Sequence, residues 1–339
     1  MTATTEAPPG SASRGLTLRR RLRRHGWTVG VWVLLGVFIA WYTTLIPEFG
    51  EFQVASIARN SLPTVYLALA QGVVVIAGGI DLGVGALMVL SNSVSAQLME
   101  DQGFTVTLML GIGVVLGAAL LNGFVGWVIA TSGIPDVVVT LGTLFIFTGI
   151  ALMVLPSPGG GTSPGFRYIF TGSETGVGVN YWPSIGMLLV PVALLATWMT
   201  RTRRGLSLYA LGSDENAAYL SGVSIKRAKI VSYAVGGGFA GLAGLAMTAL
   251  ANSGDPRFVN ALNGLLNSLA AVVLGGIVLG GGVGSVVGAV AAGIILFTLN
   301  PILTAMGVDP NTAQVVHGVL IVVVMMVAGL LQWRRRRAE

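Results

Sequence analysis

The sequence contains no cysteine and few charged residues, and both shortages exclude whole classes of protein. Without cysteine there is neither a disulfide framework nor a thiolate metal site, and two histidines alone cannot build a zinc cluster. Charged residues make up 9% of the chain, against about 25% in a typical soluble domain. Disorder is excluded as well, because 54% of the residues are hydrophobic. These figures predict that lipid surrounds most of the chain.

The motifs of common enzymes are also missing. The sequence has no Gly-x-x-x-x-Gly-Lys-Ser/Thr phosphate loop, and neither of its two lysines, Lys226 and Lys229, follows a glycine. No serine, histidine and acid can be assembled into a catalytic set, since His317 lies deep in the last apolar run, where a packed and hydrogen-bonded role is expected. We therefore predict that the protein is not an enzyme and that it holds no metal or cofactor of its own.

Ten apolar runs predict an all-α polytopic membrane protein, since a bilayer core needs about 20 apolar residues per helix. Two short runs, 83–99 and 283–300, are also compatible with re-entrant segments. The ten runs are 27–46, 61–79, 83–99, 104–130, 136–155, 183–200, 230–251, 265–279, 283–300 and 314–332.

The basic residues predict the orientation of these spans. Sixteen of the nineteen lie before the first span, between the sixth and seventh spans, or after the last span. Cytoplasmic loops carry an excess of Lys and Arg, so both termini are expected in the cytoplasm. The net charge of +6 is thus an orientation signal and not a nucleic-acid footprint. The predicted organisation is a disordered basic tail over 1–26, a transmembrane domain over 27–333 with a cytoplasmic loop at 201–229 and an external loop at 156–182, and a basic tail over 334–339.

A glycine-rich segment at 77–85 separates the second and third spans. Glycine permits a sharp reversal with positive φ, and Asp81 can cap the helix that follows. The segment is either a tight turn or a hinge that helps to form a gate. A similar segment at 274–284 aligns Gly275-Gly276-Ile277 with Gly78-Gly79-Ile80, which indicates a duplication or a chance match of glycine-rich sequence. The candidate gate and hinge residues are Gly78, Gly79, Asp81, Gly83, Gly85, Gly275, Gly276 and Gly280.

Within the cytoplasmic loop, residues 213–222 predict one short helix. Ser213 or Asp214 can cap its start and Gly222 can end it. A helix this short needs a surface to lie on, which is either its own membrane domain or a cytoplasmic partner. The candidate coupling residues are Gly212, Asp214, Glu215, Asn216, Ala217, Ala218 and Gly222.

Other intramembrane features are sparse. The glycines of the seventh span, including Gly236, Gly237 and Gly241, are expected to allow close helix packing. The external loop at 156–182 is expected to be a landing surface for an external partner. Four polar residues are candidate pathway residues: Asn122, Thr140, Thr143 and Asn300.

Four of these segments, in matching order over about 50–330, resemble the permease subunits of ribose-type ABC sugar importers. Gly78-Gly79-Ile80-Asp81-Leu82 is similar to that family's signature, with Gly83 in place of the usual Ser. The other three are residues 136–143, which depart from the family pattern at Asp136, then Asn216-Ala217-Ala218 with Ser221-Gly222, and the glycine-rich stretch at 270–285.

This resemblance implies a fold like that of the vitamin B12 importer permease, in a bacterial inner membrane. It also implies a second permease copy in a homo- or heterodimer, a cytoplasmic ABC ATPase that binds ATP and Mg²⁺, an external solute-binding protein, and import by alternating access. Membrane lipid is the other expected partner. The alternative is a stand-alone secondary transporter or facilitative channel for a small polar solute. The sequence shows no charged relay within its spans to drive such a transporter.

Overall fold

The computed structural model describes residues 12–46, 49–172, 180, 182–309, 311–323 and 326, with backbone alone for 12–25. Apart from one isolated bridge between Gly159 and Gly254, the described residues form only helices, turns and loops. The helices are α1 (Ala12–Leu45), α2 (Glu51–Ile76), α3 (Val84–Met99), α4 (Phe104–Ser132), α5 (Asp136–Val154), α6 (Pro164–Thr171), α7 (Trp182–Arg201), α8 (Arg203–Ser213), α9 (Glu215–Leu220), α10 (Ile225–Ala251), α11 (Phe258–Leu274), α12 (Val286–Ala305) and a last helix, Asn311–Val323.

The all-α prediction is confirmed for this part of the chain. Six of its helices are long and apolar enough to cross a membrane: α1, α4, α5, α7, α10 and α12. The other predicted spans coincide with α2, with the shorter helices α3 and α11, and with Asn311–Val323. Residues 324, 325 and 327–332 of the predicted span 314–332 lie outside the described residues. Helix α1 begins at Ala12, inside the stretch 1–26 that was expected to be a disordered tail.

Two predicted boundaries were wrong for identifiable reasons. Helix α2 begins ten residues before the predicted run, because Arg59 and Asn60 interrupt the apolar pattern without breaking the helix. Helix α11 covers 258–274 and not 265–279. Its first two turns carry Asn260 and Asn263, which hid them from an apolar search, and the glycines that follow Leu274 end it early.

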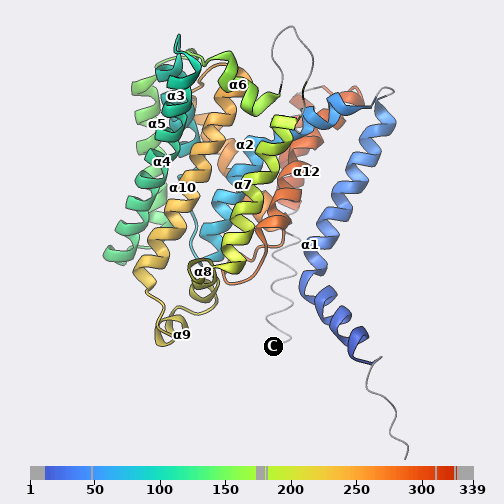
Figure 1. Cartoon of the computed structure of the whole chain (residues 1–339), viewed down its shortest axis with the longest axis vertical. Helices are drawn as coiled ribbons and strands as arrows, with labels where there is room; N and C mark the ends of the chain where they lie inside the picture. Colours follow the sequence, from blue (N-terminus) through green and yellow to red (C-terminus); the bar gives the residue numbers. More distant parts are fainter. Residues whose placement is uncertain are drawn as a thin grey trace, which may run out of the picture.

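Helices α2, α3 and α10 form the centre of the bundle. Every residue of α2 from Val65 to Ile76 is buried, against α7, α10, α11 and α12. Helix α10 packs most extensively on α4, and the expected role of its glycines in close packing is confirmed. A Cβ on Gly241 would lie 3.0 Å from the Ala118 Cβ of α4, and one on Gly236 would lie 3.0 Å from the Ala70 carbonyl of α2. Helix α1 stands at the edge, alongside α12 (Figure 1).

The two glycine-rich segments end α2 and α11 in the same way. Gly78 and Gly276 adopt φ of +86° and +85°. The amide of Gly78 donates to Val75 and the next amide donates to Val74, while Gly276 donates to Val273 and the next amide donates to Val272. This is the glycine-terminated cap in which a left-handed residue lets two amides turn back to the last helical carbonyls. In the structure Gly78 therefore corresponds to Gly276. The Gly-Gly-Ile match in the sequence had instead aligned Gly78 with Gly275, one residue away.

The left-handed cap predicts a stability cost for a side chain at Gly78. We expect Gly78→Ala to lower the free energy of unfolding by about 1–2 kcal/mol, because an L-residue is disfavoured at this φ. The matched control is Gly117→Ala in α4, where nothing lies within 4 Å of an added Cβ. Tryptophan fluorescence melts in detergent measure both variants. Equal melting temperatures for Gly78→Ala and Gly117→Ala would contradict a stability cost of a side chain at the left-handed position of the cap.

Candidate functional site

Helices α8 and α9 form a bracket at one end of the bundle, at the bottom of Figure 1. The short helix predicted within 213–222 is confirmed as α9, and a second helix, α8, precedes it and meets it at Asp214. Thr202 caps α8 by accepting from the Gly205 amide at 3.1 Å, and Asp214 caps α9 by accepting from the Ala217 amide at 2.9 Å. Gly222, at φ +83°, ends the turn that follows α9, as expected. The sequence offered either Ser213 or Asp214 as the N-cap of this helix, and in the structure the N-cap is Asp214.

The end of α8 lies directly against both glycine-rich turns. The Gly282 amide donates to the Ile76 carbonyl at the end of α2, at 2.9 Å. A Cβ on Gly281 would lie 2.8 Å from the Cα of Gly78 and 2.9 Å from the Cα of Gly212. We call Gly78, Gly212, Gly281 and Gly282 the glycine junction. Backbones approach this closely only where side chains are absent, so the bracket and the two turns are in direct main-chain contact.

The sequence named two members of this junction and missed the other two. Gly78 and Gly212 were assigned to separate sites, a gate and a coupling loop, and the fold brings them together. Gly281 and Gly282 were passed over in favour of Gly280, which is exposed. Their left-handed φ values, +84° and +70°, are compatible with the run of three glycines, but that run does not reveal which neighbours they meet.

The remaining coupling candidates lie on α9. Ala218 is buried and anchors the helix, while Glu215, Asn216 and Ala217 are exposed. Glu215 forms an ion pair with Lys229 of α10 at 3.4 Å. The most exposed apolar side chains of the bracket are Tyr219, at 69%, and Leu220, at 84%. The sequence alone does not single out these two, since a six-residue helix carries too little periodicity to show which face is free.

Asp81 lies behind the junction in a polar cluster. It is fully buried, and its carboxylate accepts from the Gly83 amide at 2.8 Å and from Asn122 Nδ2 at 2.9 Å. The expected capping role is corrected, because Gly83 occupies the N-cap of α3 and Asp81 precedes it by two residues. Asn122 also donates to the Tyr233 carbonyl at 3.0 Å. The cluster thus links the α2–α3 turn to α4 and α10.

A second branch of the cluster reaches α5. The Tyr233 hydroxyl donates to Asp136 Oδ2 at 3.1 Å, and the Thr140 hydroxyl lies 3.2 Å from the Ile80 carbonyl. A Cβ on Gly79 would lie 2.6 Å from that same Asp136 oxygen. The turn is therefore enclosed by polar groups from α5 and α10.

Three of the four candidate pathway residues belong to this cluster or lie beside it. Asn122 and Thr140 are fully buried, and Thr143 is 8% exposed with its hydroxyl donating to the Thr140 carbonyl. Their hydrogen bonds hold the α2–α3 turn, and no open surface reaches Asn122 or Thr140. Asn300, on α12, is exposed.

The other hinge candidates mark close helix crossings. A Cβ on Gly85 of α3 would lie 2.8 Å from the Leu265 amide of α11. A Cβ on Gly275 would lie 2.5 Å from the Cα of Ala289 in α12. In addition, Trp27 Nε1 of α1 donates to the Leu274 carbonyl at 2.8 Å, so α1 is tied to the second turn.

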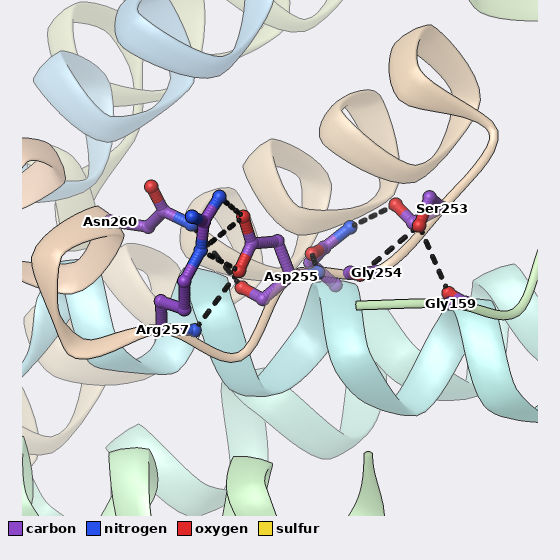
Figure 2. Close-up of polar contacts among 7 residues, drawn as sticks. Gly159, Ser253, Gly254, Asp255, Arg257 and Asn260 are labelled. Atoms are coloured by element: carbon purple, nitrogen blue, oxygen red, sulfur yellow. Dashed lines mark hydrogen bonds and ion pairs between the residues drawn. The ribbon is translucent and has the colours of Figure 1, made fainter. Parts of the chain in front are cut away.

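The opposite end of the bundle is closed by two loops that pair with each other (Figure 2). Gly159 and Gly254 exchange backbone hydrogen bonds of 3.1 and 2.8 Å, and the Ser253 hydroxyl donates to the Gly159 carbonyl. Asp255 forms an ion pair with Arg257, and the hydrogen bond from Arg257 holds the pKa of the Asp255 carboxyl below its usual range. Part of the expected landing surface, 156–182, is thus ordered by the loop that follows α10.

Two other features bear on what the protein can bind. Among the described residues no group of three or more His, Asp or Glu side chains could hold a metal ion. A cavity of about 350 Å³ between α4, α6, α7 and α10 is lined only by apolar residues and glycine, including Leu108, Gly111, Phe166 and Leu242. It offers no hydrogen-bonding side chain to a polar solute.

Comparison with known proteins decides the family. Residues 53–325, more than three quarters of the chain, match the model described as "Branched-chain amino acid transport system / permease component". The chain belongs to this family of ABC importer permeases.

The similarity of this permease to curated relatives extends over most of their length. It is 32% identical over 317 residues to a ribose import permease protein of Bacillus subtilis (strain 168), covering 91% of this chain and 96% of the relative. It is 32% identical to the D-allose transport system permease protein of Escherichia coli (strain K12), covering 86% and 89%, and 30% identical to a fructose import permease protein of Rhizobium meliloti, covering 86% and 80%. No solved structure matches the chain.

The cluster around Asp81 generates a testable coupling. We expect Asn122→Leu to destabilise the permease by about 2–3 kcal/mol, because a buried carboxylate loses a hydrogen-bond donor. In the background of Asp81→Asn the same change should cost clearly less, since the charge is gone. Thermal unfolding of the two single variants and the double variant in detergent completes a double-mutant cycle for the interaction between Asp81 and Asn122. Asn300→Leu, at an exposed position, is the control. Strict additivity would show that the two residues do not interact.

Proposed function

We propose that this permease is the transmembrane subunit of an ATP-driven importer that moves a sugar or sugar-like solute into a bacterial cell. The observation that carries the proposal is the glycine junction, where an exposed helical bracket is in main-chain contact with the end of α2 and with the loop between α11 and α12. The names of the relatives, which import ribose, allose and fructose, support the solute class.

In this proposal two permease copies stand side by side across the bilayer with ten spans each, both termini in the cytoplasm, and a fold like that of the vitamin B12 importer. A separate ABC ATPase binds ATP and Mg²⁺ on the cytoplasmic side, and an external binding protein delivers the solute. The basic residues Arg201, Arg203 and Arg204 at the α7–α8 corner support a cytoplasmic position for the bracket.

The mechanism follows from how the bracket is built. Closure of the ATPase dimer pushes α9, whose anchor Ala218 and ion pair from Glu215 to Lys229 keep it attached to α10. The push reaches the end of α2 and the loop between α11 and α12 through the glycine junction, without any flexible side chain between them. Both hairpins, α2–α3 and α11–α12, then tilt together, which alternates access between the two sides.

The competing function is transport without an ATPase. A transporter driven by an ion gradient usually places ionisable groups near the membrane midplane. Among the described residues Asp81 is the only fully buried charged side chain, and it lies in a turn at the bracket end, held by Asn122 and Gly83. This placement favours an external source of energy.

Uptake in reconstituted vesicles tests the proposal as a whole. The permease, together with the ATPase and binding protein that copurify with it, should take up D-ribose, D-allose or D-fructose only when ATP is inside the compartment that holds the ATPase. Vanadate should stop the uptake. Uptake that continues in vesicles holding the permease alone would establish the gradient-driven or channel alternative.

The exposed apolar pair on α9 predicts where the ATPase binds. We expect Leu220→Ser to weaken copurification of the ATPase about tenfold or more, because burying a leucine in an interface contributes about 1.5–3 kcal/mol. The matched control is Ser221→Ala, a neighbouring exposed position with no apolar group to lose. Quantitative pull-down measures both variants. Unchanged binding by Leu220→Ser would place the contact elsewhere.

The polar residues of α9 predict a different effect. We expect Glu215→Ala combined with Asn216→Ala to leave the ATPase bound and hydrolysing ATP while solute uptake falls several-fold, because the helix then transmits less of the motion. Parallel measurement of ATP hydrolysis and uptake in the same vesicles gives the ratio. If uptake were unchanged, these two residues would have no part in coupling.

A further inference from the structure

Helix α11 has one open face, between its contacts with two neighbouring helices. On one edge Phe258 stacks on Phe145 of α5, with ring centroids 5.8 Å apart. On the other edge the Asn267 side chain lies 2.8 Å from His317 Nε2 of the last helix, Asn311–Val323. The exposed side chains between these contacts are Val259, Asn263 and Leu266, which we call the open face of α11.

Asparagines recur at helical spacing beside this face, with Asn263 exposed and Asn260 and Asn267 half-buried. Asn260, Asn263 and Asn267 are related by steps of three and four residues, which places them on one side of the helix. We call them the asparagine stripe. The remaining residues of α11 are apolar or small, apart from the buried Ser268.

The stripe begins at the loop end of the bundle and stops inside the membrane. Asn260 Nδ2 lies 3.5 Å from the Asp255 carbonyl in the loop that carries the Asp255–Arg257 ion pair (Figure 2). Asn267 is nine residues beyond the start of α11, which is about 13 Å at a rise of 1.5 Å per residue. That distance is close to the middle of a hydrocarbon core of about 30 Å.

Beyond Asn267 the helix changes character. Ala270 and Ala271 are fully buried, and Leu274 ends the helix at the second glycine-rich turn. The open, polar half of α11 therefore lies towards the loops, and the closed, apolar half lies towards the bracket. This arrangement fits a solute-binding station that is open towards the loops. Buried side chains at the other end of α11, next to the second glycine-rich turn, close it towards the bracket.

An asparagine on an open face at membrane depth requires a polar neighbour. Polar groups that face hydrocarbon are costly, so such residues meet other polar groups across helices or line a water-filled space. The continuity of the stripe with the loop end favours water, since residues that only join two helices have no need to reach an aqueous surface. His317 adds a further polar atom beside the stripe, because its Nδ1 is buried and has no hydrogen-bond partner among the described atoms.

The chemistry of these groups suits a polyol. An asparagine amide presents two donors and an acceptor, and each sugar hydroxyl can donate and accept. Accordingly, we propose that Asn263 and Asn267, oriented by His317, form a hydroxyl-binding station for the solute on the outward half of its path through the permease. The proposal rests on the import function above and adds a selectivity step on the permease itself, after release from the external binding protein.

Transport measurements on the full reconstituted complex test the station. We expect Asn267→Leu and Asn263→Leu to lower ATP-dependent uptake at least tenfold, while ATP hydrolysis stimulated by the binding protein stays within twofold of the unaltered complex. Asn267→Ser, which keeps a hydrogen-bonding group, should recover much of the uptake. Asn311→Leu, at an exposed asparagine outside the stripe, is the control and should transport normally. Full uptake by both leucine variants would overturn the proposal.

Thiol labelling tests the water-filled space without relying on transport. The chain has no cysteine, so Asn263→Cys introduces a unique thiol. A membrane-impermeant thiol reagent added from outside should label it. The same reagent should leave Leu120→Cys unlabelled, since Leu120 is an exposed position on α4, a helix that does not pack on α11. If only a membrane-permeant reagent labels Asn263→Cys, the open face meets lipid or another helix and the station is wrong.

The two failures are distinguishable. If the unaltered complex shows no ATP-dependent uptake of ribose, allose or fructose, the import function fails whatever the labelling shows. If the unaltered complex transports and the leucine variants transport equally well, the import function stands and the hydroxyl-binding station fails.

Discussion

The structure depends on one contact between backbones. At the glycine junction the end of α8 meets the turns after α2 and α11 so closely that a Cβ on Gly281 would fall within 3 Å of two other Cα atoms. The Gly282 amide bonds to the Ile76 carbonyl across the same contact. Because main chain touches main chain, the position of the bracket and the positions of two buried helices are not independent.

The interior around this contact contains a region of closely packed small residues and separate groups of polar residues. The centre, formed by α2, α3 and α10, is held by close packing of small residues, which is what drives helix association where lipid removes the hydrophobic difference. The polar cluster of Asp81, Asn122 and Tyr233 lies at one end of that centre and fixes the first turn. The asparagine stripe lies along α11, where Asn263 is exposed and Asn267 is paired with His317. Polar groups inside the membrane thus serve structure at one place and the proposed pathway at another.

Much of the fold was predictable because lipid imposes simple rules. Apolar runs of span length marked nearly every helix, and paired glycines marked the ends of α2 and α11. The errors came where those rules were too simple. Arg59 and the asparagines of α11 break the apolar pattern but not the helix, since helical hydrogen bonding tolerates a polar side chain on a face that meets water or protein.

The sequence by itself determined the solvent of this protein, its helical class, its family and the chemistry available at each turn, because these follow from composition and from local order. Only the tertiary structure decided which turns meet. It joined Gly78 to Gly212 and Gly281, buried Asn122 beside Asp81, and left Asn263 open. The reason is physical: residues more than a hundred positions apart become neighbours through helix packing, and no local pattern records which face of a helix its partner will cover.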